Sequence, residues 1–353
     1  MTTLIVPAAG KSSRYPDMKT KWLLTHPTGD IMIQKVLDAA EYKEFDRVVI
    51  TILREHCEKY EADTILHQVF GSTVETFILE KPTNGPAETV YRTIVGMNIE
   101  DDIVIKDSDA VVAFANPIPE HNFITGLTID SQSPVMHIQS KSFIIKNDDD
   151  IILDIVEKEI VSNIICVGVW KVGSQQFIDA YKKIINSNVF RSDREIYVSH
   201  IISHLIVQQN VVFEFIEAME YINWGALPAW HRELKKYDTY IFDIDGVLLK
   251  NYGKYGEKNW SNTFEPIEKN MQMLEELSKN GNQIIFMTAR SEEYVDEFIS
   301  YITSRGIKYK SIITECNHSK RVIINDFANT NPYPSCEAIS IPRNGQNLSE
   351  YIK

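Results

Sequence analysis

The spacing of apolar and polar positions along the chain predicts strands that alternate with helices. Compact apolar runs bounded by polar or turn residues have the length expected of strands that are covered on both faces. These runs are TLIVPA (3–8), RVVITIL (47–53), DIVIKD (102–107), PVMHIQ (134–139), IICVGVW (164–170), TYIFDID (239–245), QIIFMTA (283–289) and RVIIND (321–326). Apolar residues recur at helical spacing after Ser291, which can cap a helix that Gly306 ends. A similar helix is expected over about residues 266–279, before Asn280 and Gly281.

This alternation indicates an α/β architecture with a largely parallel sheet. The 353 residues exceed what one core usually supports, so two domains are expected. A short charged stretch, His231–Asp238, directly precedes a new apolar strand. We therefore expect one domain at residues 1–235 and a second at residues 236–353. A connection this short favours domains that are held against each other over domains on a long flexible tether.

The composition and the charge limit the classes of partner. The chain is 44% hydrophobic and 24% charged, which is ordinary for a globular protein, and its formal net charge is -13. A nucleic-acid-binding protein usually carries a basic face, so no nucleic-acid partner is expected. An acidic protein that handles phosphates must do so with local cations or with Mg²⁺.

Several features favour a cytoplasmic protein. The N-terminus lacks a basic region followed by an apolar segment, so no signal peptide is expected. No apolar run approaches the roughly 18 residues of a membrane span. The four cysteines are scattered and form no Cys-x-x-Cys pair, which favours reduced thiols. The sequence does not determine the oligomeric state, and a homo-oligomer is compatible with it.

The first predicted strand ends in a loop that suits a polyphosphate. Small residues let a phosphate approach the backbone N–H groups, and basic side chains follow them. The basic residues are Lys11, Arg14 and Lys21. The loop lacks the spaced glycines of a Walker loop and of the dinucleotide-binding pattern. The nucleotide-binding residues expected here are Ala8, Ala9, Gly10, Lys11, Ser12 and Ser13.

This stretch resembles the signature of the sugar-phosphate nucleotidylyltransferases, in which a Gly-x-x-x-Arg loop is followed by a Lys before Leu-Leu. Gly10, Arg14 and Lys21 match that pattern. Later stretches resemble further motifs of the family, in the same order, over roughly residues 3–230. They are EKPTNGPAETV with Glu80, Gly85 and Pro86, IVIKDSDAVV with Asp107 and Asp109, VEKEIVSNIICVGVWKV with Lys158, Gly168 and Trp170, and YINWGALPAW with Asn223.

The resemblance implies a fold and a reaction. The fold would be a nucleotidyltransferase α/β sandwich, in which an acceptor phosphate attacks the α-phosphorus of a nucleoside triphosphate and pyrophosphate leaves. Mg²⁺ would be held by Asp107 with Asp109 as its neighbour. The leaving pyrophosphate would be steadied by Arg14 and Lys21. The substrate-binding residues would be Lys158, Gly168, Trp170 and Asn223.

Two residues bear on the details of that reaction. The family usually has a second metal-binding aspartate where this chain has Asn223, which offers a carbonyl oxygen but no charge. Glu80 accepts hydrogen bonds and donates none. Guanine and cytosine offer N–H groups to such a carboxylate, so GTP or CTP is favoured over UTP as the donor.

A second group of polar residues begins with Asp243 and Asp245, which end an apolar strand and precede Gly246. Burying carboxylates there is costly unless a cation offsets their charge. The pattern resembles the Asp-x-Asp-Gly motif of the haloacid dehalogenase superfamily, which consists mostly of phosphatases. Further residues resemble the other three motifs in order. They are Thr288, Lys320, and Asn325 with Asp326.

This second resemblance implies a hydrolase domain, so that the chain would hold two Rossmann-like doubly wound domains. Asp243 would be the nucleophile that forms an aspartyl-phosphate, and Asp245 would be the general acid and base. The phosphoryl oxygens would be bound by Thr288 and Lys320. Mg²⁺ would be held by Asp243, Asp245, Asn325 and Asp326. The asparagine replaces the usual aspartate of the fourth motif, and the lysine precedes it more closely than is typical.

Together the two resemblances imply a bifunctional enzyme of nucleotide-activated sugar synthesis, serving surface polysaccharides. A bisphosphorylated sugar would lose one phosphate, and the remaining anomeric phosphate would receive the nucleotide. Two alternatives stay open. The acceptor could be a phospho-alcohol or phosphonate such as phosphocholine, with Trp170, Trp224 and Trp230 in an aromatic cage. The second domain could instead be a phosphate-sensing or assembly module without catalysis, or act on a different intermediate.

Overall fold

The computed structural model forms two compact units. It describes residues 1–15, 18–114, 116–130, 138–187, 195–253, 260, 264–326 and 335–352. The first unit comprises residues 1–230 and the second residues 231–353. The division falls within helix α7 (Leu227–Lys235).

The first unit is built on a mixed sheet whose central strands are parallel, as the alternating pattern predicts. Its strands are β1 (Thr2–Pro7), β2 (Arg47–Leu53), β3 (Glu75–Leu79), β4 (Asp102–Lys106), β6 (Phe123–Thr128), β7 (Ser142–Lys146), β8 (Ile152–Glu157), β9 (Ile164–Gly173) and β10 (Glu214–Glu217). In the described residues the order is β10-β6-β9-β4-β1-β2-β3, and the β7–β8 hairpin joins beside β9. β1 runs parallel to β2 and β4, whereas β9 runs antiparallel to β4 and β6.

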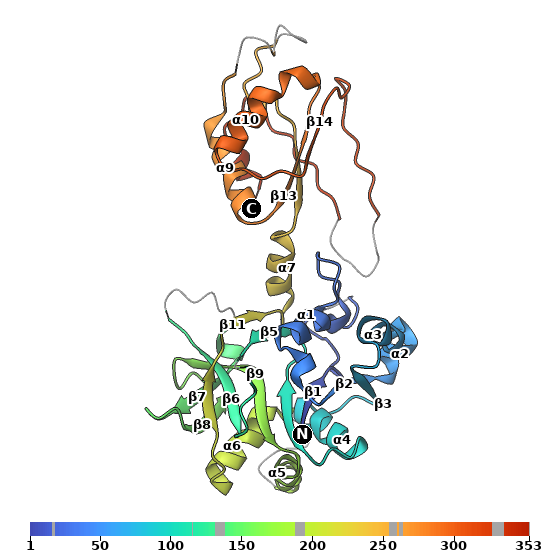
Figure 1. Cartoon of the computed structure of the whole chain (residues 1–353), viewed down its shortest axis with the longest axis vertical. Coiled ribbons are helices and arrows are strands. Elements are labelled where there is room, and N and C mark those ends of the chain that lie inside the picture. Colours follow the sequence, from blue (N-terminus) through green and yellow to red (C-terminus); the bar gives the residue numbers. More distant parts are fainter. Residues whose placement is uncertain are drawn as a thin grey trace. The chain divides into compact units, whose positions relative to one another are not determined.

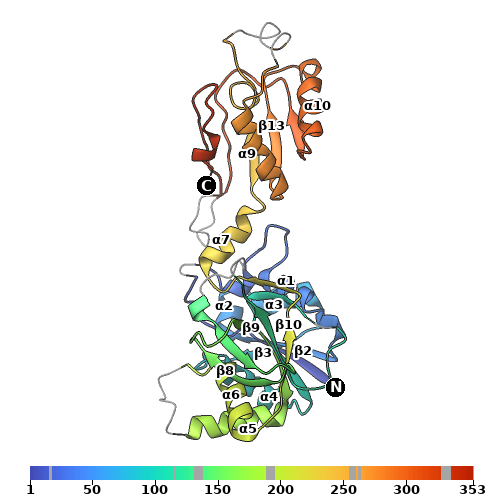
Figure 2. The same ribbon diagram turned by 90° about the vertical axis from the view of Figure 1, so that its left-hand side faces the viewer.

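Helices cover both faces of this sheet. They are α1 (Met32–Ala39), α2 (Arg54–Tyr60), α3 (Ala62–Phe70), α4 (Pro86–Gly96), α5 (Ser174–Asn186) and α6 (Val198–Gln209), with short turns η1 (Lys21–Leu23), η2 (Tyr42–Glu44) and η3 (Ile138–Ser140). Side chains along a strand point alternately to opposite faces. Leu4 and Val6 of β1 therefore share a core with α1 and α3, while Ile5 shares the other with α4, α5 and α6. Figures 1 and 2 show α4, α5 and α6 gathered on one side of the sheet.

Parallel pairing brings the carboxyl ends of β1 and β4 to the same edge of the sheet. Leu4 is paired with Val104, and Ile5 with Ile105. The loop after β1 and the turn after β4 therefore begin side by side. A small antiparallel pair follows that turn, made of β5 (Ala110–Ala113) and β11 (Glu220–Asn223).

The second unit contains a three-stranded parallel sheet. Its elements are β12 (Thr239–Phe242), α9 (Glu268–Lys279), β13 (Gln283–Met287), η4 (Glu292–Tyr294), α10 (Asp296–Ser304), β14 (Ser311–Ile313) and η5 (Leu348–Glu350), and the strand order is β12-β13-β14. The rings of Phe286 and Phe298 meet edge to face in its core, with centroids 5.1 Å apart. As predicted, Gly281 and Gly306 follow the two helices with left-handed φ values of 90° and 74°. No helix in the described parts of either unit is long and apolar enough to span a membrane.

Two strand predictions differ from the structure, and a third falls mostly on residues that the structure does not describe. The strand expected over residues 321–326 is wrong, because this segment is exposed and forms no strand, and β14 is the third strand of the sheet in the described residues. The run at 134–139 lies largely outside the described residues, and its last two residues belong to η3. β12 is not covered on both faces, since Ile241 is 44% exposed on a strand paired along one edge. Apolar composition alone did not distinguish residues 321–326 and β12 from buried strands.

Candidate active site

The loop after β1 and the turn after β4 are joined by charged side chains. Lys21, in η1, forms an ion pair with Asp109, which lies between β4 and β5. Arg14 Nη1 donates to the carbonyl of Gly225 over 3.2 Å. The backbone N–H of Trp224 donates to the carbonyl of Asp109 over 2.8 Å. The loop, the acidic turn and the segment after β11 are therefore tied together.

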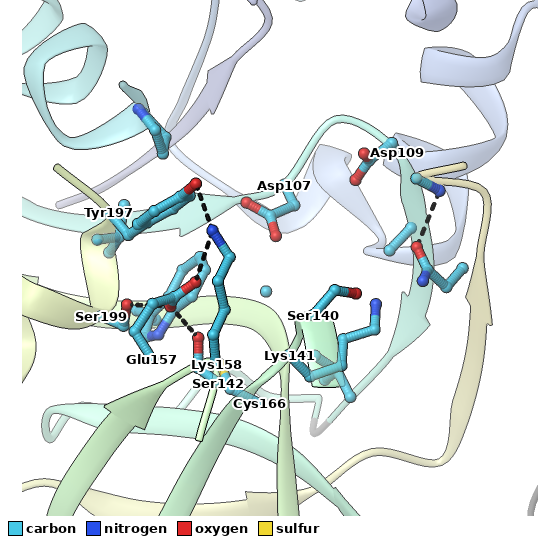
Figure 3. Close-up of a pocket in the computed structure, with 18 of the residues that line it drawn as sticks. Asp107, Asp109, Ser140, Lys141, Ser142, Glu157, Lys158, Cys166, Tyr197 and Ser199 are labelled. Atoms are coloured by element: carbon cyan, nitrogen blue, oxygen red, sulfur yellow. Dashed lines mark hydrogen bonds and ion pairs between the residues drawn. The ribbon is translucent and has the colours of Figure 1, made fainter. Parts of the chain in front are cut away.

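A cavity of about 140 Å³ opens beside this junction (Figure 3). It brings together residues from both sets that the sequence predicted. Those expected on the donor side are Arg14, Pro86, Asp107 and Asp109. Those expected on the acceptor side are Lys158, Gly168, Trp170 and Asn223. The structure therefore brings residues from both predicted sets around one space.

The two aspartates of the acidic turn, Asp107 and Asp109, differ in their charge environment. Burial, and then the charge of Asp109, raises the pKa of Asp107 to about 6. Burial acts on Asp109 in the same sense, but the ion pair with Lys21, followed by the charges of Lys141 and Arg14, together outweigh it and lower the pKa of Asp109 to about 2. Asp109 thus has a directly paired cation, whereas the lysines near Asp107 do not fully offset its burial and the charge of Asp109.

Lys106 supports the acidic turn from inside the protein. Its side chain is fully buried, and its ammonium donates to the carbonyls of Asp107 and Ala110 over 2.9 and 2.6 Å. Burial lowers the pKa of Lys106 to about 8, against the opposing effect of the two aspartates. These bonds hold the two ends of the turn together.

Gly168 of β9 lies directly against the Asp107 carboxylate. Its φ is 85°, and an added Cβ would lie 2.4 Å from Asp107 Oδ2. The N–H of Asp107 also donates to the carbonyl of Gly168 over 2.9 Å. Only glycine tolerates both this backbone conformation and this approach.

The open end of the β7–β8 hairpin forms another wall of the cavity. Ser142 is paired with Glu157 in the ladder, and the hydroxyls of Ser142 and Ser199 both donate to Glu157 Oε2. Lys158 has φ 59°, and its ammonium donates to the Tyr197 hydroxyl over 2.5 Å. That ammonium also lies 3.9 Å from the centre of the Tyr197 ring. Figure 3 shows these side chains around the pocket.

The remaining residues of the predicted triphosphate loop are absent from the cavity lining. Two of these residues, Ala8 and Ala9, are buried, whereas Gly10, Lys11 and Ser13 are exposed. Ser12 has φ 49°, and its hydroxyl accepts a hydrogen bond from the N–H of Lys21 over 3.0 Å. Ser12 thus stabilises the loop conformation, while its exposed neighbours are accessible to a ligand.

The predicted base-reading stretch is divided in the structure. Glu80 is exposed and forms an ion pair with Arg54, with 2.9 Å between Oε1 and Nη2. Gly85 has φ 128°, and an added Cβ would lie 2.6 Å from the carbonyl oxygen of Ile196. Pro86 follows as the first residue of α4 and lines the cavity. The structure brings Pro86 to the cavity lining but not Glu80.

The oxygen atoms around the acidic turn suit Mg²⁺, which binds few protein ligands and retains water or phosphate oxygens. Asp107 offers a carboxylate whose raised pKa shows that the nearby lysines do not fully offset its burial and the charge of Asp109. A Cβ built on Gly225 would lie 3.0 Å from Asn223 Oδ1 and 3.1 Å from Asp109 Oδ2, so these two oxygens are close. No cluster of three or more His, Cys, Asp or Glu side chains suited to a metal occurs in the described ranges. Substrate oxygens would therefore have to complete the shell.

Several polar residues of the cavity were not predicted from the sequence. Glu157 and Tyr221 belong to stretches that resemble family motifs, beside Lys158 and Asn223, so their position offered a signal. Lys141 lies outside every motif and precedes β7. Its approach to the cavity depends on the pairing of β7 with β8, which no local pattern encodes.

In the second unit, Asp243, Asp245 and Thr288 follow neighbouring parallel strands at one sheet edge. Asp245 is half-buried, but Asp243 is exposed, so the expectation that both are buried is wrong for Asp243. The surrounding protein still reduces its hydration, and with the charge of Asp245 it raises the pKa of Asp243. Thr288 is fully buried, and its hydroxyl accepts a hydrogen bond from the N–H of Arg290 over 3.1 Å.

Arg290, which the sequence motifs did not single out, provides the cation for Asp245. Its Nε and Nη2 atoms donate to the two carboxylate oxygens over 2.9 and 2.7 Å. Lys320, expected to offset the aspartates, is exposed. The predicted metal ligands Asn325 and Asp326 are exposed too, in the segment that forms no strand, and the Asn325 amide donates to the Ser335 carbonyl over 3.1 Å.

Comparisons with known proteins identify the fold of most of the chain. No protein-family model and no curated protein matches the sequence. A nucleoside-diphosphate-sugar pyrophosphorylase from Vibrio cholerae RC9 is 16% identical, with a TM-score of 0.56 over 66% of this chain and 99% of that chain. A UDP-glucose pyrophosphorylase from Acinetobacter baumannii is 15% identical, with a TM-score of 0.51 over 67% of this chain and 93% of that chain. The inositol-1-phosphate CTP transferase from T. maritima is 12% identical, with a TM-score of 0.50 over 66% of this chain and 97% of that chain.

About two thirds of the chain thus has the fold of nucleotidyltransferases, as the resemblance implied. This share is close to that of the first unit, which has 230 of the 353 residues. At identities this low, the likeness concerns the fold alone. These matches do not extend over the remaining third, so the hydrolase fold expected there stays a prediction.

Gly168→Ala is expected to destabilise the first unit by at least about 1–3 kcal/mol, because it adds a Cβ at a left-handed φ against Asp107. Denaturant unfolding measures this change. Gly10→Ala is the matched control, since a Cβ there meets no atom within 4 Å. Equal stability of the two variants would contradict the proposed constraint.

Asp107→Asn is expected to stabilise the metal-free protein more at pH 7 than at pH 5. The folded protein raises the pKa of Asp107, so the charged form opposes folding above pH 6 and this effect is relieved as the pH falls. The gain should be larger by about 1 kcal/mol at pH 7. Urea unfolding in a chelator at the two pH values measures it, and a gain independent of pH would contradict the account.

Proposed function

We propose that the first unit is an Mg²⁺-dependent nucleotidyltransferase that transfers a nucleotide from a nucleoside triphosphate to a phosphorylated acceptor and releases pyrophosphate. The observation that carries the proposal is the junction of the loop after β1 with the acidic turn, through Lys21 and Asp109, beside a cavity with its own cations. The names of the similar structures, which include two pyrophosphorylases of nucleotide sugars, support the same class of reaction.

The residues present suit a reaction in which positioning and charge neutralisation do most of the work. Mg²⁺, when held by Asp107 and Asp109 with the neutral oxygen of Asn223, would neutralise phosphate charge near the α-phosphorus. Arg14 and Lys21 bind the phosphates that leave as pyrophosphate. The acceptor phosphate oxygen forms a bond to the α-phosphorus while the bond from phosphorus to the pyrophosphate oxygen breaks.

The cavity favours a phosphorylated sugar over a phosphocholine-like acceptor. The aromatic faces that could bind a quaternary ammonium are near lysine cations, since Lys158 lies over Tyr197 and Lys141 over Tyr221. Of the three expected cage members, Trp170 lines the cavity, whereas Trp224 and Trp230 are almost fully buried and pack on each other. Glu157, with two serine hydroxyls on it, offers a carboxylate to the hydroxyls of a sugar.

GTP or CTP remains our proposed donor. Glu80 lies in the stretch before α4, and both of its hydrogen bonds with Arg54 involve Oε1. Its Oε2 atom is suited to accept a hydrogen bond from an N–H group of guanine or cytosine. Approach of the base to Glu80 would be part of donor binding.

For the second unit we propose phosphate-ester hydrolysis of the haloacid dehalogenase type. The exposed Asp243 is accessible for attack on phosphorus, and the adjacent Asp245 can protonate the leaving oxygen. The buried Thr288 at the same sheet edge supports this assignment. The roles of Lys320, Asn325 and Asp326 require their exposed segment to approach that edge.

The alternative, a phosphate-binding module without catalysis, is favoured by one contact. Arg290 occupies both oxygens of Asp245, which restricts its use as an acid. If hydrolysis does occur, the chain would be bifunctional, removing one phosphate from a bisphosphorylated sugar and activating the other. A place in surface polysaccharide synthesis follows from that pair of reactions.

Thermal unfolding with Mg²⁺ and ATP, CTP, GTP or UTP tests the first proposal without knowledge of the acceptor. A donor present at about 100 times its dissociation constant should stabilise the folded protein by roughly 2.7 kcal/mol. We expect the largest shift with GTP or CTP. The absence of a shift with every nucleotide would contradict nucleotide binding by this unit.

Asp243→Asn is expected to abolish phosphate release from sugar bisphosphates, because the amide cannot act as the nucleophile. Nucleotide-induced stabilisation should be unchanged in this variant. Phosphate release is measured with a colorimetric assay over a panel of sugar bisphosphates. Equal release by the variant and the natural protein would contradict the proposed nucleophile.

A further inference from the structure

We infer that Lys141 is a further catalytic residue of the first unit, whose ammonium contacts the oxygens of the phosphoryl group that is transferred. The inference rests on the proposed nucleotidyl transfer and assigns a new residue to it. Lys141 lines the same cavity as Asp107, Asp109 and Lys158 (Figure 3).

The backbone around Lys141 fixes its position at the open end of the β7–β8 hairpin. Its N–H donates to the carbonyl of Ile138 over 3.0 Å, in the turn η3. Its carbonyl accepts a hydrogen bond from the N–H of Lys158 over 3.0 Å. The two lysines of the hairpin are therefore neighbours through their backbones, and both enter the lining of the cavity.

The side chain of Lys141 is directed by a tyrosine from a different sheet. Its Nζ donates to the Tyr221 hydroxyl over 2.7 Å and lies 5.4 Å from the centre of that ring. Tyr221 belongs to β11 and is paired with Val112 of β5, directly after the acidic turn. The hydroxyl thus holds the ammonium on the side of the cavity where the aspartates lie.

Lys141 lies near the charged residues of the proposed phosphate and metal site. Burial lowers the pKa of Lys141, and the positive charge of Arg14 lowers it further. The negative charges of Asp109 and, to a smaller extent, Asp107 act in the opposite direction. Its ammonium is thus within electrostatic range of both proposed metal ligands and of a proposed triphosphate ligand. A phosphoryl group bound between these residues would lie next to it.

Lys141 differs from Lys21 in the partner that it has in this structure. Lys21 is paired with the carboxylate of Asp109, whereas the hydrogen-bond partner of Lys141 is a neutral phenol. An ammonium has three donors, and Tyr221 accepts one of them. A partly buried cation of this kind is stabilised by an anionic ligand, because the surrounding protein has replaced water. Such a cation favours the added charge of the transition state at phosphorus.

The test compares the binding of inorganic triphosphate and inorganic pyrophosphate, each with Mg²⁺, by isothermal titration calorimetry. Triphosphate reaches the position of the α-phosphate, whereas pyrophosphate occupies the site of the leaving group. Lys141→Met should weaken triphosphate binding by about 10-fold to 100-fold, as expected for a lost charged hydrogen bond. Pyrophosphate binding should change by less than about threefold. Lys146→Met is the matched control: it alters a lysine of β7 that is paired with Asp150, and it should change neither affinity.

The outcomes separate the inference from the function on which it rests. Equal weakening of both ligands by Lys141→Met would indicate a structural role and overturn the inference, as would no weakening of triphosphate binding. Failure of the natural protein to bind either ligand would overturn the proposed function as well. If Lys141→Met does not fold, Tyr221→Phe removes only the hydroxyl and should weaken triphosphate binding by about 3-fold to 10-fold. Unchanged triphosphate binding in that variant would overturn the inference.

Discussion

The burial of two neighbouring carboxylates, Asp107 and Asp109, is the constraint on which the first unit depends. Two carboxylates this close in a partly buried turn require nearby positive charge. The chain supplies it from separate elements: Lys106 from inside, Lys21 by an ion pair, and Lys141 from the open end of the β7–β8 hairpin. Asp107 still has a raised pKa, so the neutralisation is incomplete without a bound cation. The negative charge that remains makes the turn suitable for Mg²⁺, and the surrounding lysines are suitable for binding phosphates.

The second unit offsets its acidic pair in a different way. Arg290 binds Asp245 with two hydrogen bonds, while Asp243 remains exposed. A planar guanidinium matches a carboxylate in geometry as well as in charge. The protein itself thus neutralises one aspartate fully, and the other stays accessible to solvent and to a ligand. In both units the aspartates follow a parallel strand. The units differ in how much of the negative charge of these aspartates is offset by cations of the protein itself.

The fold and the ends of its strands could be predicted from the sequence because both depend on local patterns. Alternating apolar runs predicted the α/β architecture, and polar residues after β1, β4, β12 and β13 predicted the two sites. Lys141 and Arg290 could not be found in this way. Lys141 reaches the cavity only through the pairing of β7 with β8, and the importance of Arg290 depends on where its side chain meets Asp245. The segment at 321–326 has strand composition, but the sheet in the structure has β14 as its third strand.

The turn after β4 is the proposed metal and phosphate centre of the first unit. Anomalous diffraction from crystals soaked with Mn²⁺ and an inorganic triphosphate tests it most directly. We predict a manganese peak within about 2–2.5 Å of a carboxylate oxygen of Asp107 or Asp109, with the triphosphate alongside it. Manganese and triphosphate bound together elsewhere, with this turn empty of both, would contradict the claim.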